Sequence, residues 1–171
     1  MSQNSDSDSR AGAEAGGMPV AGFDQAFALA ETEHATQTDK AGAAYILHVR
    51  RVIDGVQKIA PADLVQDCRV VAALHDVVED CPVTLEDLTV LGFSQEVVDG
   101  VDSVTKREGE EYLDMVRRAG ENPLGRWVKL ADNLDNSNPE RVAKLSASDA
   151  EWFEKKYAGA RAVLAEYGAV V

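Results

Sequence analysis

Val70-Val-Ala-Ala-Leu-His-Asp-Val-Val-Glu-Asp80 is an apolar run that leads directly into four titratable side chains. Buried polar groups of this kind are costly unless something pairs with them. If the run is helical, Glu79 lies one turn after His75 and Asp80 lies one turn after Asp76, so each pair shares a face. Imidazole and carboxylate ligands together suit a divalent metal such as Mn²⁺, Fe²⁺ or Zn²⁺. The stretch therefore predicts a metal site, and the alternative is a helix end that carries solvated acids.

The overall composition indicates one globular domain. The chain has 171 residues, of which 45% are hydrophobic, and it contains no run of 18 apolar residues that could cross a membrane. The first ten residues lack the apolar core of a signal peptide. Only two cysteines, Cys68 and Cys81, are present, which is typical of a reduced, cytoplasmic protein.

The charge limits the class of partner. A net charge of −13 makes the chain a poor general binder of DNA, RNA or an anionic membrane surface. An anionic substrate would need a metal ion and a few well-placed Lys or Arg side chains. Because the chain has three histidines, any metal site must draw heavily on carboxylates.

The secondary-structure pattern divides the chain into a tail and a helical remainder. Residues 1–20 are rich in Ser, Asp, Gly and Ala and cannot bury enough apolar surface to order themselves, so we expect a flexible tail. Residues 21–171 show helical spacing of apolar side chains and no period-2 strand, which predicts an all-α fold. Capping boxes are expected at Thr84 with Asp87 and at Ser148 with Glu151, where the last helix would begin.

The second half of the site is predicted after Pro123. A helix over Leu124–Asn136 would place Asp132 at the edge of its apolar face, where a carboxylate needs a cation or strong hydrogen-bond donors. A salt bridge from Asp132 to an arginine is the alternative. His48, taken alone, is more typical of a packed core histidine. Together with His75 and Asp76, however, His48 and Asp132 make a plausible single-metal site drawn from three helices.

These residues resemble a known family. The order His48, His75-Asp76, Asp132 is that of the HD-domain metal-dependent phosphohydrolases, and the resemblance is closest to the RelA/SpoT-type hydrolase domains and small alarmone hydrolases. It rests on five stretches that are similar to motifs of that branch. They are Tyr45-Ile-Leu-His48, Ala73-Leu-His-Asp-Val-Val-Glu-Asp80, Thr84-Leu-Glu-Asp-Leu88, Val98-Asp-Gly-Val-Asp-Ser-Val-Thr-Lys106 and Val128-Lys-Leu-Ala-Asp-Asn-Leu-Asp-Asn136.

The resemblance implies a fold and a set of roles. The fold would be an HD-domain helical bundle of about six to nine helices over residues 21–171. One Mn²⁺-like ion would be held by the four residues His48, His75, Asp76 and Asp132. Glu79 and Asp80 match the pair that positions and deprotonates the attacking water. The substrate-binding positions would be Lys40 near the phosphates, Asn136 at the nucleotide sugar and Tyr157 along the nucleotide pocket.

The implied activity is removal of the 3′-pyrophosphate from guanosine tetra- or pentaphosphate. Asp39-Lys40 stands where the family has Arg-Lys, and Asp135 stands where the family has His, so residues near the base differ more than the metal residues do. Two alternatives are therefore open: the same chemistry on another nucleotide or phosphate ester, and a non-catalytic nucleotide-sensing protein with the HD fold. The patterns fit more than one divalent metal, and they also fit a homo-oligomer.

Overall fold

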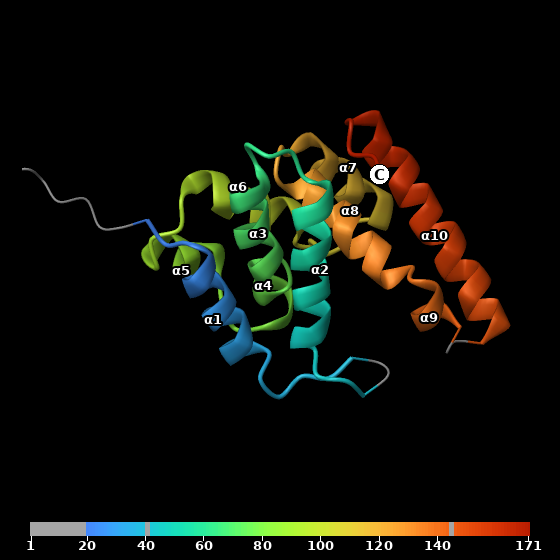
Figure 1. The fold of residues 1–171 in the computed structure, drawn as a ribbon, viewed down its shortest axis with the longest axis horizontal. Coiled ribbons are helices and arrows are strands. Elements are labelled where there is room, and N and C mark those ends of the chain that lie inside the picture. The colour runs from blue at the N-terminus through green and yellow to red at the C-terminus, as the bar shows by residue number, and fades with distance from the viewer. Residues whose placement is uncertain (1–19, 40–41, 144–145) are drawn as a thin grey trace, which may run out of the picture.

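The structure, a computed structural model, describes residues 20–39, 42–143 and 146–171, and these residues form a bundle of helices (Figure 1). The helices are α1 (Phe23–Glu33), α2 (Ile46–Ile59), α3 (Val65–Leu74), α4 (Val77–Asp80), α5 (Leu85–Val90), α6 (Gln95–Val104), α7 (Tyr112–Glu121), α8 (Gly125–Asn136), α9 (Pro139–Val142) and α10 (Ala147–Glu166). Within the described ranges no β-strand occurs, only an isolated bridge between Thr38 and Ala44. The all-α prediction is confirmed, whereas the expected tail over residues 1–20 lies outside the described residues except for Val20.

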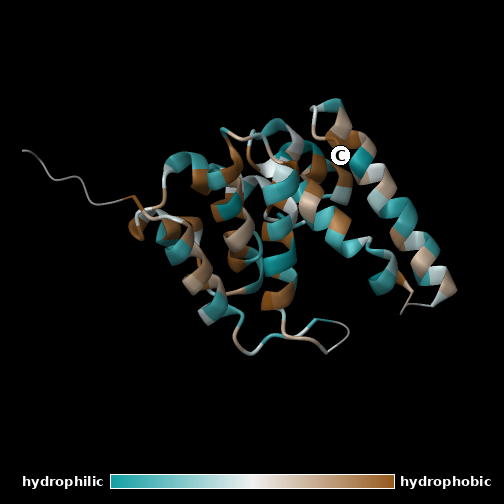
Figure 2. Cartoon of the chain, in the orientation of Figure 1, coloured by the Kyte–Doolittle hydropathy of each residue, from teal (hydrophilic) through white to brown (hydrophobic). Residues whose placement is uncertain are grey.

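Helix α2 lies at the centre of the bundle, where it packs against α3 on one side and α8 on the other (Figure 1). Its buried face carries Val49, Val52, Ile53 and Val56, which keep the spacing of one helical stripe. Hydrophilic and hydrophobic residues alternate along α2, as expected for an amphipathic helix (Figure 2). The packing of α2 against both neighbours fixes the relative position of three segments that carry polar side chains into the interior.

The core has two parts, and α8 contributes to both. The larger cluster joins α1, α2, α3 and α6 with Val128 and Ala131 of α8. The smaller cluster joins α7 and α10 with Leu130 of α8. Because α8 is held on two sides, the polar residues at its end have a well-defined place between the clusters.

Several helix starts follow the local sequence signals. Thr84 forms the expected capping box with Asp87, since the Thr84 hydroxyl accepts from the Asp87 backbone N–H and Asp87 accepts from the Thr84 N–H. The last helix, by contrast, is capped two residues earlier than predicted. Ser146, not Ser148, accepts from the backbone N–H of Asp149. The stretch offers two overlapping Ser-x-x-acid signals, and the first of them starts the helix.

The helix leading into the titratable cluster is interrupted, which corrects the expectation of one continuous helix. Helix α3 ends at Leu74, and α4 begins at Val77. Asp76 lies between them with φ −107° and ψ −4°, away from regular helical values. The Asp80 N–H still donates to the Asp76 carbonyl over 2.9 Å, so the one-turn relation between these two residues is kept.

None of the helices in the described part of the chain has the length and apolar character needed to cross a bilayer.

Candidate metal centre

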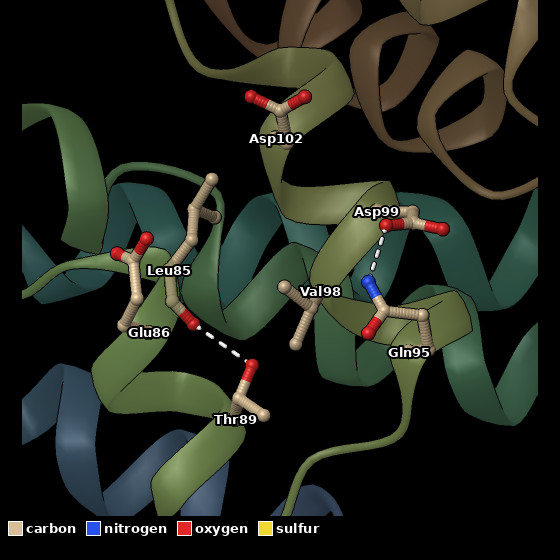
Figure 3. Close-up of a pocket in the computed structure, with 7 residues that line it drawn as sticks. All are labelled: Leu85, Glu86, Thr89, Gln95, Val98, Asp99 and Asp102. Carbon is tan, nitrogen blue, oxygen red and sulfur yellow. Dashed lines mark hydrogen bonds between the residues drawn. The ribbon is translucent and has the colours of Figure 1, made fainter.

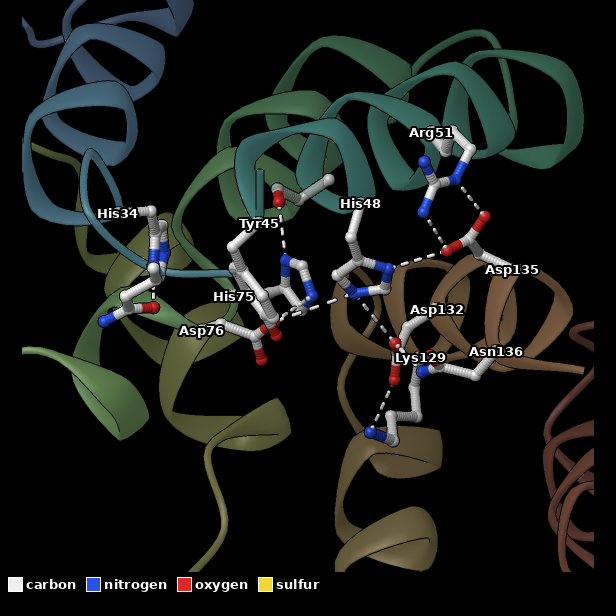
Figure 4. A network of polar contacts seen from close by, with 12 residues as sticks. His34, Tyr45, His48, Arg51, His75, Asp76, Lys129, Asp132, Asp135 and Asn136 are labelled. Carbon is white, nitrogen blue, oxygen red and sulfur yellow. Dashed lines mark hydrogen bonds and ion pairs between the residues drawn. The ribbon is translucent and has the colours of Figure 1, made fainter. Parts of the chain in front are cut away.

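Three buried side chains from separate segments meet in the interior (Figure 4). His48 comes from the first turn of α2, His75 from the α3–α4 junction and Asp132 from α8. One ligand atom of each lies within 4.8 Å of the others. The prediction that residues some 30 and 80 positions apart in the chain converge here is therefore supported for these three by the geometry.

Hydrogen bonds determine which ring nitrogen of each histidine faces the centre. His75 Nδ1 lies 2.8 Å from the Ala72 carbonyl oxygen, and His48 Nδ1 lies 2.7 Å from Asp135 Oδ2. A carbonyl or carboxylate oxygen only accepts, so both Nδ1 atoms carry the hydrogen. In the neutral rings both Nε2 atoms then present a lone pair to the centre.

Asp76 lies against both of these lone pairs. Its Oδ2 is 2.8 Å from His75 Nε2 and 3.7 Å from His48 Nε2, and it accepts a hydrogen bond of 2.6 Å from the Tyr45 hydroxyl. The fourth predicted ligand is thus beside the three-residue group. Tyr45, at the start of α2, holds the Asp76 carboxylate in that orientation.

Asp132 is held by two side chains of its own helix. Lys129 Nζ lies 2.8 Å from Asp132 Oδ2, and Asn136 donates to Asp132 Oδ1 over 2.6 Å. The same Oδ1 lies 3.4 Å from His48 Nε2. The alternative expectation of an arginine partner for Asp132 is not met, since its cation is a lysine one turn earlier on α8.

The electrostatics of the group favour positive charge at its centre. Burial alone would lower the pKa of His48, but its contacts with Asp132 and Asp135 outweigh burial and raise that pKa to about 9. The pKa of His75 is raised in the same way, against burial, by Asp76. Burial would raise the pKa of Asp132, yet the Lys129 ammonium outweighs it and holds that pKa well below its usual range.

The donor set fits a divalent cation. His75 Nε2 is buried and makes no hydrogen bond of adequate geometry, although a carboxylate oxygen lies 2.8 Å away. Two lone-pair atoms facing each other at that distance require a proton or a metal between them. Two imidazoles and carboxylates are the ligands that Zn²⁺, Mn²⁺ and Fe²⁺ accept. The residues present therefore suit one such ion.

A cavity of about 340 Å³ opens beside this group. Four basic side chains contribute to its wall, namely Lys106, Lys129, Arg141 and Lys156. The predicted residues Glu79, Asn136 and Tyr157 line the same cavity, together with Tyr45, His48, Asp76 and Asp132. Basic residues gathered around one cavity are notable in a chain of net charge −13, and they match an anionic ligand.

Glu79 is tethered at the edge of this cavity, since its Oε2 accepts from the Lys106 backbone N–H over 2.9 Å. Asp80 is not among the lining residues, and its own carbonyl accepts from Gln37. Burial, Asp76 and Glu79 all raise the pKa of Asp80, the direction that suits a proton acceptor near neutral pH. Lys40 falls outside the described residues.

A second pocket, of about 230 Å³, lies between α5 and α6 (Figure 3). It is lined by the carboxylates of Glu86, Asp99 and Asp102 and by no basic residue. Gln95 donates to Asp99 over 2.7 Å within it. Its charge opposes an anionic ligand, so the cavity at the metal centre is the candidate site.

The sequence prediction missed three side chains that shape the centre. Lys129 lies three residues before Asp132, and this spacing on one helix face is the signal that could have indicated the pair. Tyr45 lies three residues before His48, so this spacing could likewise have indicated that its side chain lies near the centre, where its hydroxyl donates to Asp76. Lys156 lines the cavity with its ammonium 4.2 Å from the Tyr112 ring centroid, a cation–π contact for which the sequence holds no local signal.

A helical bundle that buries two histidines and an aspartate around one point, beside a basic cavity, is the arrangement expected of an HD-domain fold. The comparisons with known proteins agree with this fold. No family model matches the chain. Among solved structures, a metazoan orthologue of SpoT that hydrolyses ppGpp superimposes with a TM-score of 0.65 at 24% identity, over 86% of this chain and 88% of the other.

Curated relatives lead to a narrower assignment. The chain is 30% identical over 120 residues to the guanosine-3′,5′-bis(diphosphate) 3′-pyrophosphohydrolase of Aquifex aeolicus, which covers 66% of this chain and 17% of that protein. It is 35% identical over 144 residues to a probable GTP pyrophosphokinase of Mycobacterium leprae, over 74% of this chain and 18% of the relative. The chain thus spans less than a fifth of the length of these relatives. It is homologous to the RelA/SpoT hydrolase region.

Proposed function

We propose that this chain is a divalent-metal-dependent phosphohydrolase that removes the 3′-pyrophosphate from guanosine tetra- or pentaphosphate. The observation that carries the proposal is one cavity whose wall contains His48 and Asp132 of the buried group together with four basic side chains. The relatives named as 3′-pyrophosphohydrolases, and the ppGpp-hydrolysing structural neighbour, support the choice of substrate.

We assign the metal to His48, His75, Asp76 and Asp132, and we expect Mn²⁺. When bound, the ion supplies Lewis-acid stabilisation of phosphoryl negative charge and lowers the pKa of a coordinated water. The protein residues keep the ligand atoms in place. Tyr45 orients Asp76, and Asn136 orients Asp132 through hydrogen bonds of 2.6 Å each.

The proton transfers fall to Glu79 and Asp80. Water attacks the phosphorus that is joined to the 3′-oxygen, and Glu79 or Asp80 accepts the proton that the water loses. The bond between this phosphorus and the 3′-oxygen breaks, and a proton returns to the 3′-oxygen as pyrophosphate departs. The backbone N–H of Lys106 holds the Glu79 carboxylate at the cavity edge throughout.

The basic residues would bind the polyphosphate. They approach the cavity from different elements: Lys106 lies in the loop after α6, Arg141 on α9 and Lys156 on α10. Their charges offset those of the substrate where a protein of net charge −13 would otherwise repel it. Tyr157, buried at 7% exposure, offers an aromatic face for the nucleotide.

A second candidate is the same reaction on another nucleotide. It is favoured by Asp39, which occupies the place of an arginine in the resembling family. The Asp39 carboxylate accepts from the Ala43 backbone N–H over 3.0 Å, so it serves the loop that precedes α2. No guanidinium is supplied at this position to stack on a base.

The test is a hydrolysis panel in Mn²⁺, with and without a chelator, over guanosine tetraphosphate, nucleoside triphosphates and nucleoside monophosphates. The proposal predicts release of pyrophosphate from guanosine tetraphosphate, abolished by the chelator. Turnover of monophosphates alone would establish the second candidate instead. Binding of metal and nucleotide without release of pyrophosphate or phosphate would show a non-catalytic nucleotide sensor.

A further inference from the structure

Asp135 is a buried carboxylate of α8 that receives hydrogen bonds from three side chains, two of which, His48 and Arg51, are seen in Figure 4. Its Oδ2 accepts from His48 Nδ1 over 2.7 Å and from Arg141. Its Oδ1 accepts from Arg51 Nε over 2.6 Å. These contacts join α2, α8 and α9, and they place Asp135 directly behind one of the candidate metal ligands.

The contact with His48 fixes both the hydrogen and the plane of the ring. Because Nδ1 donates to Asp135, Nε2 is the nitrogen left to point at the centre, where Asp132 Oδ1 lies 3.4 Å away and Asp76 Oδ2 lies 3.7 Å away. A carboxylate that accepts from the rear nitrogen of a metal-binding histidine fixes its tautomer and makes the front nitrogen a stronger donor.

The two arginines hold this carboxylate in place. Arg51 Nε lies 2.6 Å from Asp135 Oδ1, and Arg141 donates to Asp135 Oδ2, so two guanidinium cations face the buried carboxylate. A buried carboxylate without such cations would be strongly destabilising. Arg51 lies three residues after His48 on α2, so one helix face presents both the ring and the cation that holds its partner.

The two imidazoles of the centre differ in the group that accepts the hydrogen bond from Nδ1. His75 donates from Nδ1 to a backbone carbonyl, that of Ala72, which carries no formal charge. His48 donates to a carboxylate. A substitution at Asp135 therefore changes the support of one imidazole and leaves the support of the other intact, which makes its role separable by experiment.

We propose that Asp135 is a positioning residue for the metal centre: it holds His48 with Nε2 toward the ion and, with Arg51 and Arg141, sets the strength of that ligand. The inference rests on the proposed metal site. It predicts that loss of the carboxylate weakens metal binding, and that loss of Arg51 alone, which leaves the Asp135–His48 bond and the Arg141 cation in place, weakens it less.

The test compares Mn²⁺ affinity, by competition with a chelator of known affinity, in the wild type and in Asp135→Ala, Asp135→Asn and Arg51→Gln. Asp114→Asn is the matched control, since it removes an exposed aspartate that is paired with Arg117 away from the cavity. Asp135→Ala should bind about 10- to 100-fold more weakly, the usual effect of removing such a partner. Asp135→Asn should be intermediate, because its amide oxygen still accepts but carries no charge.

A spectroscopic measurement separates positioning from general damage. Nitrogen NMR of the imidazoles in Zn²⁺-loaded protein should show His48 protonated at Nδ1 in the wild type, with this signal shifted in Asp135→Asn and the His75 signal unmoved. If Asp135→Ala does not fold, the Mn²⁺ affinity and the NMR spectrum of Asp135→Asn decide whether Asp135 positions His48. Unchanged Mn²⁺ affinity and an unchanged His48 signal would overturn the inference, whereas a wild type that binds no Mn²⁺ would overturn the metal site beneath it.

Discussion

Lys129→Met removes the cation of a buried ion pair while keeping an unbranched side chain. Lys129 Nζ lies 2.8 Å from Asp132 Oδ2, and the two side chains are 12% and 10% exposed. At an effective dielectric constant of about 20, charges at this separation attract by roughly 6 kcal/mol before the cost of their burial is counted. Removing one partner of a buried pair lowers the free energy of unfolding by about 3 to 5 kcal/mol. For Lys129→Met we expect a loss at the lower end, about 3 kcal/mol, because protonated imidazoles beside Asp132 can replace part of the missing positive charge.

The assay is urea unfolding followed by circular dichroism, in chelator and in excess Mn²⁺. Arg117→Met is the matched control, since it breaks a pair of 2.6 Å whose side chains are 52% and 62% exposed. Such exposed pairs contribute about 0 to 1 kcal/mol. The loss in Lys129→Met should be larger than in the control and should shrink in Mn²⁺, which supplies positive charge beside Asp132. A loss no larger than the control's would contradict a strong buried Lys129–Asp132 pair, and the same loss with and without Mn²⁺ would contradict a metal ion beside Asp132.

Three other outcomes are expected. Glu79→Gln and Asp80→Asn should retain metal but lower kcat by about 10²- to 10⁴-fold, the range for a general base. Metal analysis together with product assays checks this. Loss of metal from both variants would mean that these carboxylates are metal ligands. Glu110 accepts two hydrogen bonds from Arg118, and these bonds lower the pKa of Glu110. The pair therefore stabilises the fold fully at pH values above the ordinary glutamate pKa of about 4.3. This stabilisation is lost as the pH falls through the lower pKa that Glu110 has in the folded protein. The melting temperature of Glu110→Gln should therefore approach that of the wild type in acid. A difference in melting temperature that stays the same at every pH would contradict this. Asp39→Arg should raise kcat/KM for guanosine tetraphosphate, since guanidinium stacking contributes on the order of 1 kcal/mol; an equal or lower value would mean a pocket built for another ligand.

The fold could be predicted from the sequence because its signals are local. Apolar spacing marks the buried stripe of α2, and Thr84 with Asp87 marks the start of α5. Where two local signals overlap, the sequence does not choose between them, as with Ser146 and Ser148. The break of the helix at Asp76 has no such marker, because its cause is the tertiary place of the carboxylate between Tyr45 and two histidines.

The site could be predicted where a residue stands out alone or completes a group. His48 is predicted only together with His75, Asp76 and Asp132. Asp132 stands out alone, as an acid at the edge of an apolar helix face. Asp135 does not, since its partner His48 lies 87 positions away in the chain and is brought near by the packing of α2 on α8. The basic wall of the cavity is likewise a tertiary feature, because Lys106, Arg141 and Lys156 belong to separate elements.

The proposed activity depends on one divalent ion held by His48, His75, Asp76 and Asp132. The measurement that tests this site is the metal-to-protein ratio, by elemental analysis, of wild-type protein and of Asp132→Ala after loading with Mn²⁺ and removal of free metal. Circular dichroism establishes that the variant is folded. A four-ligand site predicts one ion per chain in the wild type and almost none in folded Asp132→Ala. An unchanged ratio in the folded variant would contradict the four-ligand site.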